Sequence, residues 1–145
     1  MLIAQDAETA GRAVRANGLR LSTARRLVLE ALYTAPAPVA ADEIADGLGG
    51  RLPRSDLASV YRNLETLEQV GLVRHVHLGH GPGRYTPAGR PGDFLVCERC
   101  EHVAAVDTEQ LRAAREAIRA ATGFEAHFHH FPISGLCGGC SGTDH

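Results

Sequence analysis

Apolar residues recur at helical spacing through the first half of the chain and predict four helices there. The first covers residues 5–16. The second begins after Ser22, a residue type that caps helices, and it ends before Pro36 because proline cannot continue a helix. Its apolar stripe consists of Ala24, Leu27, Val28, Ala31 and Leu32.

The third and fourth predicted helices are followed by a β-hairpin. The third runs over residues 41–48, and the fourth is capped by Ser55 or Asp56 and ends at Gly71. The inward stripe of the fourth helix is Leu57, Val60, Leu64 and Leu67, and its opposite face carries Ser59, Arg62, Asn63 and Thr66. The predicted hairpin has a strand at 72–78, a tight turn at 79–83 and a returning strand at 84–86.

This order of helices and hairpin predicts a winged helix. In that fold a helix with a short polar face enters the major groove of DNA, and the hairpin lies beside it on the backbone. Small helical domains with a hairpin also serve as protein-interaction modules, so the pattern alone leaves that alternative open.

The remaining residues predict a second, smaller α/β unit. Residues 87–92 are rich in proline and glycine and predict a hinge. Two strands follow at 94–96 and 103–106, and a helix begins after Asp107, with Gln110 placed to bond back to its first turn. The buried stripe expected for that helix is Leu111, Ala114, Ile118 and Ala121. Gly123 ends the helix, and a last strand is expected at 125–133.

We therefore expect an α+β protein with an N-terminal domain over 1–86, a hinge over 87–92 and a C-terminal domain over 93–145. Hydrophobic residues make up 44% of the chain and charged residues 22%, which is typical of a packed globular protein. No apolar run approaches the roughly 20 residues that span a bilayer, and the first residues do not form a secretory signal. A cytoplasmic protein without a membrane partner is expected.

The basic residues are all arginine and are concentrated in the N-terminal part. Residues 1–90 hold eleven arginines against nine acidic residues, whereas residues 91–145 hold four against eight. Guanidinium groups bind phosphate in a bidentate manner, so this distribution favours contact with a nucleic-acid backbone. A solvated helix face would give the same charge pattern.

Two Cys-x-x-Cys pairs, Cys97 with Cys100 and Cys137 with Cys140, predict a metal site in the C-terminal unit. Two residues between thiolates let both sulfurs face one ion, and four thiolates form the closed tetrahedral shell of structural zinc. A thioredoxin-like redox pair is the main alternative, but that motif sits at the start of a helix after a strand, and Cys140 is followed by only five residues. Four free thiols are the other alternative.

Across nearly its whole length the chain resembles the ferric uptake regulator family. The resemblance rests on Gly18–Arg26, on the segment Ala58–Leu64, on the hairpin and on the two cysteine pairs around a strand-helix-strand unit. It implies a winged-helix DNA-binding domain hinged to an α/β dimerisation domain, and metal-dependent repression from a palindromic operator on double-stranded DNA by a homodimer. Regulated genes would concern metal uptake, or metal and oxidative-stress homeostasis.

Carried onto this sequence, the resemblance implies roles for particular residues. The expected DNA contacts, with their neighbours on the same elements, are Ser59, Tyr61, Arg62, Asn63, Arg20 and Arg25. The four cysteines match the structural zinc ligands of many members.

The usual sensing ligands of the family are missing here. The histidine-rich run before the first cysteine pair is replaced by Pro91–Phe94, and Pro38 and Thr86 stand where a histidine and a glutamate are frequent. Instead, His75, His77 and His80 resemble the wing of nickel-responsive members, in which two wing histidines join one histidine shortly before the third cysteine. His130 matches that last ligand best, and His129 is close to it.

Imidazole-rich sites suit nickel, zinc, iron or cobalt, so ligand type does not select the regulatory metal, and nickel, zinc, iron and manganese are the candidates. Alternation along a strand would place His75 and His77 on one face, and likewise His127 and His129. A metal that joined the wing to the last strand would fix the hinge and so the spacing of two recognition helices.

Two other functions remain open. One is a regulator of the same fold that senses peroxide, haem or a partner. The other is a thiol oxidoreductase, which would need a reactive thiolate; the sequence carries no Ser-His-Asp order, P-loop or dinucleotide motif that predicts another enzyme.

Overall fold

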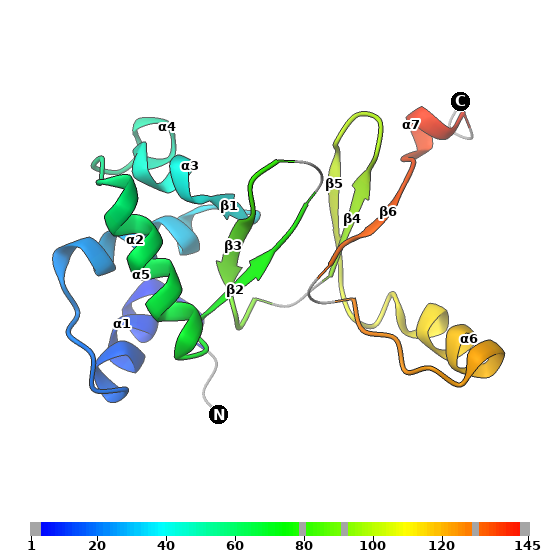
Figure 1. Cartoon of the computed structure of the whole chain (residues 1–145), viewed down its shortest axis with the longest axis horizontal. Coiled ribbons are helices and arrows are strands. Elements are labelled where there is room, and N and C mark those ends of the chain that lie inside the picture. The colour runs from blue at the N-terminus through cyan, green and yellow to red at the C-terminus, as the bar shows by residue number, and fades with distance from the viewer. Residues whose placement is uncertain (1–3, 79–80, 91–92, 129–130, 143–145) are drawn as a thin grey trace. The chain divides into compact units, whose positions relative to one another are not determined.

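The computed structural model describes residues 4–78, 81–90, 93–128 and 131–142. It divides into an N-terminal unit, Met1–His75 with Gly83–Arg90, and a C-terminal unit, Val76–Pro82 with Pro91–His145 (Figure 1). The segment after His75 groups with the C-terminal unit because Val76 and Leu78 pack against Phe94 and Val96. The domain limits expected from the sequence, 1–86 and 93–145 with a hinge at 87–92, stay predictions.

The N-terminal unit is a winged helix in which helices pack on a small sheet. Its elements are α1 (Ala7–Ala16), α2 (Thr23–Thr34), β1 (Val39–Ala40), α3 (Ala41–Ala45), α4 (Gly47–Gly50), α5 (Leu57–Gln69), β2 (Val73–Val76) and β3 (Arg84–Pro87). The strands lie in the order β1-β3-β2, and β1 runs antiparallel to β3 with Val39 opposite Tyr85. The predicted succession of helices and hairpin is confirmed.

Side-chain caps start the three longer helices of this unit. Asp6 accepts a hydrogen bond from the Thr9 N–H at 2.7 Å, Ser22 from Arg25 at 3.1 Å, and Asp56 from Ser59 at 3.0 Å. Each bond satisfies one of the N–H groups that the first turn of a helix leaves without a partner. Ser22 was the predicted cap of α2, and Asp56 is the one of the two candidates that caps α5.

The core of the N-terminal unit is mainly aliphatic. Its fully buried members come from all three longer helices: Val14, Val28, Leu29, Leu32, Val60, Leu64 and Leu67. Two predictions about α5 were wrong. Leu57, expected to face inward, is 43% exposed, whereas Asn63, expected on the polar face, is only 8% exposed.

The third predicted helix was too long. α3 ends at Ala45, and the chain turns back through Leu48 and Gly49, whose φ angles of 54° and 72° lie in the left-handed region. The turn begins at Gly47, where the φ angle is 74° and an added Cβ would collide with the Leu52 carbonyl. A helix cannot continue through such a close approach of two backbone segments.

Arg90 secures the end of the N-terminal unit to the C-terminus of α2. Its Nη1 donates to the Ala35 carbonyl at 2.7 Å and its Nη2 to the Tyr33 carbonyl at 3.5 Å. Carbonyl groups at a helix C-terminus attract a cation because they carry the negative end of the helix dipole.

We expect Arg90→Ala to destabilise the N-terminal unit by about 1 kcal/mol, the net value of hydrogen bonds from a charged donor reduced for partial exposure. Arg54→Ala is the matched control, because the Arg54–Asp46 ion pair is 3.9 Å long and highly exposed. All three tyrosines lie in this unit, at positions 33, 61 and 85, and the chain has no tryptophan, so tyrosine fluorescence reports its thermal unfolding. Equal melting temperatures for the two variants would contradict the role of Arg90.

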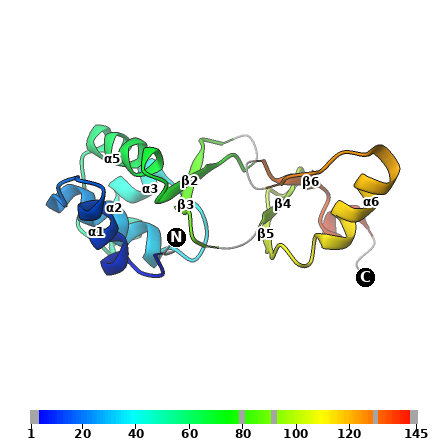
Figure 2. The same ribbon diagram turned by 90° about the horizontal axis from the view of Figure 1, so that it is seen from below.

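The C-terminal unit is a three-stranded sheet with one crossover helix. Its elements are β4 (Asp93–Cys97), β5 (Val103–Val106), α6 (Arg112–Thr122), β6 (Ile133–Gly135) and α7 (Gly138–Ser141). The strand order is β5-β4-β6; β4 is antiparallel to β5 and parallel to β6. A parallel pair needs a long connection, and Figure 2 shows α6 supplying it.

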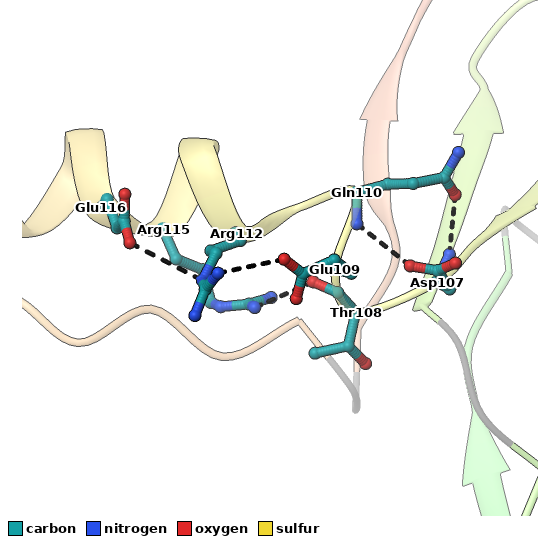
Figure 3. A network of polar contacts seen from close by, with 7 residues as sticks. All are labelled: Asp107, Thr108, Glu109, Gln110, Arg112, Arg115 and Glu116. Atoms are coloured by element: carbon teal, nitrogen blue, oxygen red, sulfur yellow. Dashed lines mark hydrogen bonds and ion pairs between the residues drawn. The ribbon is translucent and has the colours of Figure 1, made fainter.

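Asp107 and Gln110 form the predicted reciprocal pair, but one turn before the helix. The Asp107 N–H donates to Gln110 Oε1 at 2.9 Å and the Gln110 N–H donates to Asp107 Oδ1 at 3.0 Å (Figure 3). These bonds close a turn, and α6 itself begins at Arg112. Arg112 then pairs with Glu109 at 3.1 Å and with Glu116 at 3.8 Å, which holds the turn against the first turn of α6.

Two further predictions for this unit were wrong. α6 has no buried residue, so its expected stripe is at most partly covered within one chain. The last strand is only Ile133–Gly135, and residues 124–128 are not a strand. The alternation of side chains along a strand, from which the face of His127 was predicted, therefore does not apply to it. The Nε2 of His127 lies 3.1 Å from Glu125 Oε1. Among the described residues, none of the helices could span a lipid bilayer.

Candidate zinc centre and nucleic-acid interface

The first cysteine pair occupies the turn between β4 and β5. Cys97 is the last residue of β4, and its N–H donates to the His102 carbonyl at 2.9 Å. Inside this turn the Glu101 N–H donates to the Cys97 carbonyl at 2.9 Å, with Glu101 in the left-handed region at a φ of 63°. The hairpin thus folds Cys100 back toward Cys97.

The second pair is brought to the first by the register of β6. Cys97 lies opposite Gly135, and the Glu98 N–H donates to the Gly135 carbonyl at 2.8 Å. Two residues later Cys137 begins the short turn α7, in which the Cys140 N–H donates to the Cys137 carbonyl at 3.1 Å. The hydrogen-bonded register of β4 with β6 therefore brings the two cysteine pairs together.

All four sulfurs converge on one point. They lie within 4.8 Å of one another, and the Cys100 and Cys137 sulfurs are 3.7 Å apart. Tetrahedral zinc with Zn–S bonds of about 2.3 Å requires sulfurs about 3.8 Å apart, so the arrangement fits this ion. Since all four positions of the ion would be filled by protein, zinc here would crosslink the sheet and would not activate a substrate.

Backbone N–H groups already favour a thiolate in this cluster. Hydrogen bonds to the Cys97 sulfur from the Cys100 and Cys137 N–H groups, 3.5 and 3.4 Å long, lower the pKa of Cys97 to about 5. Hydrogen bonding of the Cys140 thiol to the sulfurs of Cys137 and Cys97 raises the pKa of Cys140 to about 12. One end of the cluster therefore holds negative charge, while the other holds a proton that a cation would displace.

Arg99 is a contributor that the sequence did not reveal. Its Nη1 donates to the Cys140 carbonyl at 3.2 Å and links the first cysteine turn to the second. An arginine between two cysteines carries no motif that would have identified this contact.

The histidines that the structure describes do not form a comparable cluster. Among the described residues, the four cysteines are the one group of three or more histidine, cysteine or acidic side chains close enough to share an ion. His80, His129 and His130 lie outside the described residues.

His75 and His77 have different neighbours. The His75 ring stacks on Tyr85 at 4.7 Å and 6°, and it packs so closely on Gly83 that a Cβ there would collide with its Nε2. His77 is exposed and lies beyond the end of β2, with its ring 6.1 Å from that of Phe131. The strand alternation that was expected to place both rings on one face therefore stops before His77.

The exposed face of α5 carries three of the six residues expected to contact DNA. Tyr61 is 47% exposed, Arg62 is exposed and Ser59 is partly exposed, while Val60, Leu64 and Leu67 anchor the opposite side of the helix. Arg20 is exposed and Arg25 is half-buried. Asn63 differs from the others, because its amide is directed toward Arg25 and not toward the surface.

Known proteins share the fold of this chain. The model of the ferric uptake regulator family matches residues 16–134. The chain belongs to the ferric uptake regulator family. It is accordingly a metal-dependent, DNA-binding transcriptional repressor, and its four cysteines have the arrangement of a structural zinc site.

Individual members of the family align with this chain over 88% to 97% of its length. The peroxide operon regulator of Bacillus subtilis is 27% identical over 140 residues, which is 97% of each chain. The ferric uptake regulator of Helicobacter pylori, described as having three functional metal-binding sites, shares the fold with a TM-score of 0.71 at 21% identity and 97% coverage of both chains. The ferric uptake regulator of Vibrio cholerae has a TM-score of 0.67 at 25% identity, covering 88% of this chain and 98% of its own.

Proposed function

We propose that this repressor binds a palindromic operator on duplex DNA in the cytoplasm, with α5 in the major groove. The exposed face of α5 carries the proposal. Tyr61 and Arg62 project from a helix whose other side is fixed in the core, which is the arrangement that a groove-reading helix needs. Ser59 shares this helix, and Arg20 and Arg25 lie near the start of α2, where they suit contacts with phosphates.

The proposed active form is a homodimer joined through the C-terminal unit. α6 has no buried residue within one chain, and Phe124 and Phe131 are 73% and 62% exposed. Apolar surface of this kind is typical of an interface. A second copy is the proposed occupant, because a two-fold dimer presents two recognition helices to two symmetric half-sites.

We propose no enzymatic activity. The four thiols lie at zinc-ligand spacing, and a metal that holds all of them leaves none to attack a substrate. Zinc retained in the purified protein together with thiols that do not react with an alkylating reagent would support this proposal, whereas turnover of a disulfide substrate would contradict it.

Regulation is proposed to use a second divalent metal, nickel, zinc, iron or manganese, on His75, His77, His80, His129 and His130. A metal controls DNA affinity only if it binds the DNA-competent form more tightly than the other form. Of this set, the structure describes His75 and His77. His75 lies within β2, and His77 follows its last residue.

We expect His75→Ala with His77→Ala to abolish metal-dependent DNA binding while the zinc content remains unchanged. His127→Ala is the control, because that ring pairs with Glu125 outside the proposed set. Operator affinity is measured across a titration with each metal in turn. Unchanged metal dependence in the double variant would exclude these two histidines.

The experiment that tests the proposed function is selection of duplexes from a random pool by the zinc-loaded protein, with and without added divalent metal. Enrichment of an inverted repeat only with metal supports the proposal. A second arm adds hydrogen peroxide, because the Bacillus subtilis relative is a peroxide operon regulator. Release of DNA by peroxide alone would favour a peroxide sensor of the same fold, and enrichment of no sequence would contradict operator binding.

A further inference from the structure

Asn63 occupies a buried position between the recognition helix and α2. It is only 8% exposed, although its neighbours Tyr61 and Arg62 face solvent. A buried amide must satisfy its donors and its acceptor within the protein, because unsatisfied polar groups are costly in a core. The partners of this amide therefore show what it does.

The hydrogen bonds of Asn63 are directed inward and along its own helix. Its Nδ2 donates to the Ser59 carbonyl at 3.0 Å and lies 3.4 Å from Ser59 Oγ, and its Oδ1 accepts from Arg25 Nε at 3.0 Å. Reading adenine would need both the amide nitrogen and the amide oxygen of the side chain. Both are committed to the protein here, so Asn63 is poorly suited to contact a base.

The guanidinium of Arg25 is held at two points. Besides the bond from Nε to Asn63, Nη1 donates to the Arg20 carbonyl at 2.6 Å. The guanidinium is planar, so two anchors define its orientation. Three of its five N–H groups remain, both on Nη2 and one on Nη1, and these can meet the oxygens of a phosphate.

We propose that Asn63 is a positioning residue that directs the Arg25 guanidinium toward a DNA phosphate and ties this contact to the recognition helix. Asn63 lies on α5 and Arg25 on α2, so the hydrogen bond fixes the register between the groove-reading helix and a backbone contact. An oriented arginine loses less conformational freedom on binding than a mobile one. This inference rests on the proposed binding of duplex DNA through α5.

A double-mutant cycle separates positioning from direct contact. The zinc-loaded full chain is compared with Arg25→Ala, Asn63→Ala and the double variant, on a duplex that the wild-type protein selects from a random pool. We expect Arg25→Ala to weaken binding roughly tenfold, as for loss of a charged hydrogen bond. Asn63→Ala should weaken it roughly threefold to tenfold. The double variant should match Arg25→Ala within about twofold, because Asn63 acts through Arg25.

Salt and sequence dependence provide readouts that a merely structural role would not change. Loss of one phosphate contact makes the plot of log affinity against log salt concentration less steep by about 1, and it weakens binding to all sequences equally. We expect this for Arg25→Ala, and a smaller decrease for Asn63→Ala, with the base preference of both proteins unchanged. Arg26→Ala is the matched control, since it removes the same charge one residue away without any hydrogen bond to Asn63.

Arg25→Lys keeps the charge and tests the orientation without altering the buried amide. We expect it to bind nearly as weakly as Arg25→Ala, since an ammonium donates from a single nitrogen and lacks the planar fork whose separate nitrogens reach Asn63, Arg20 and a phosphate. Binding within twofold of wild type for Arg25→Lys, losses that multiply in the double variant, or an altered base preference for Asn63→Ala would each overturn the inference. Absence of any duplex preference in the wild-type protein would overturn the proposed function as well, which distinguishes the two failures.

Discussion

Replacing Cys137 with serine should release zinc and unfold the C-terminal unit. This unit has little else to hold it together, because its buried apolar cluster is small and α6 contributes no buried residue. Structural zinc sites supply roughly 10–16 kcal/mol of binding energy that becomes folding energy. A small unit whose core cannot offset chain entropy depends on such a crosslink. We therefore expect loss of the C-terminal unit as a whole, a larger effect than the loss of a single core side chain.

The result is measured by the zinc content of the purified protein and by hydrogen exchange of β4 and β6. Ser141→Ala is the control; it removes the bond from the Ser141 hydroxyl to the Gly138 carbonyl at 3.1 Å and leaves all four sulfurs in place, so zinc should remain. In the wild-type protein, zinc affinity should fall as the pH falls, because protons compete for the same sulfurs. A Cys137→Ser protein that keeps one zinc and a protected β6 would show that the fourth sulfur is not needed.

The same variant separates the two units. Since the tyrosines all belong to the N-terminal unit, their fluorescence should still report cooperative unfolding when the C-terminal unit is lost. Retained tyrosine unfolding together with lost operator binding would indicate that the C-terminal unit is needed to assemble the repressor and not to fold the winged helix.

Features that depend on residues close in the sequence, such as the cysteine pairs and the helix caps, could be predicted. The pairing of strands that lie far apart in the sequence could not. The cysteine pairs were identifiable because two residues between thiolates already define a metal-binding turn. Caps such as Ser22 were identifiable for the same reason, as each bonds within one helical turn. The register of β6, which places Gly135 beside Cys97, depends on residues nearly forty positions apart, and an apolar run did not reveal where that strand begins.

Amphipathic spacing was informative only where a partner surface exists within the chain. On α5 it identified Val60, Leu64 and Leu67 correctly, because α2 and α3 pack against that helix. On α6 the same spacing predicted burial at Ile118, which is only partly covered in a single chain. Periodicity shows that a face is apolar, but not whether its cover comes from the same molecule. Asn63 could not be recognised as buried, because its partner Arg25 lies 38 residues away.

Leu64→Ala should destabilise the N-terminal unit by about 2–5 kcal/mol, a large fraction of the roughly 5–15 kcal/mol that stabilises a typical domain. Leu64 is completely buried in the core that α5 shares with α1 and α2, so the deletion leaves a cavity. Urea unfolding followed by tyrosine fluorescence measures the change, because all three tyrosines report this unit. Operator binding should be lost as the recognition helix loses its support.

Leu57→Ala is the matched control on the same helix. Leu57 is 43% exposed, and surface substitutions usually change stability by less than about 0.5 kcal/mol. The comparison therefore tests the orientation of α5 itself, which places Tyr61 and Arg62 toward DNA. If Leu57→Ala were as destabilising as Leu64→Ala, α5 would be rotated about its axis relative to the structure described, and the residues assigned to the groove-reading face would have to change.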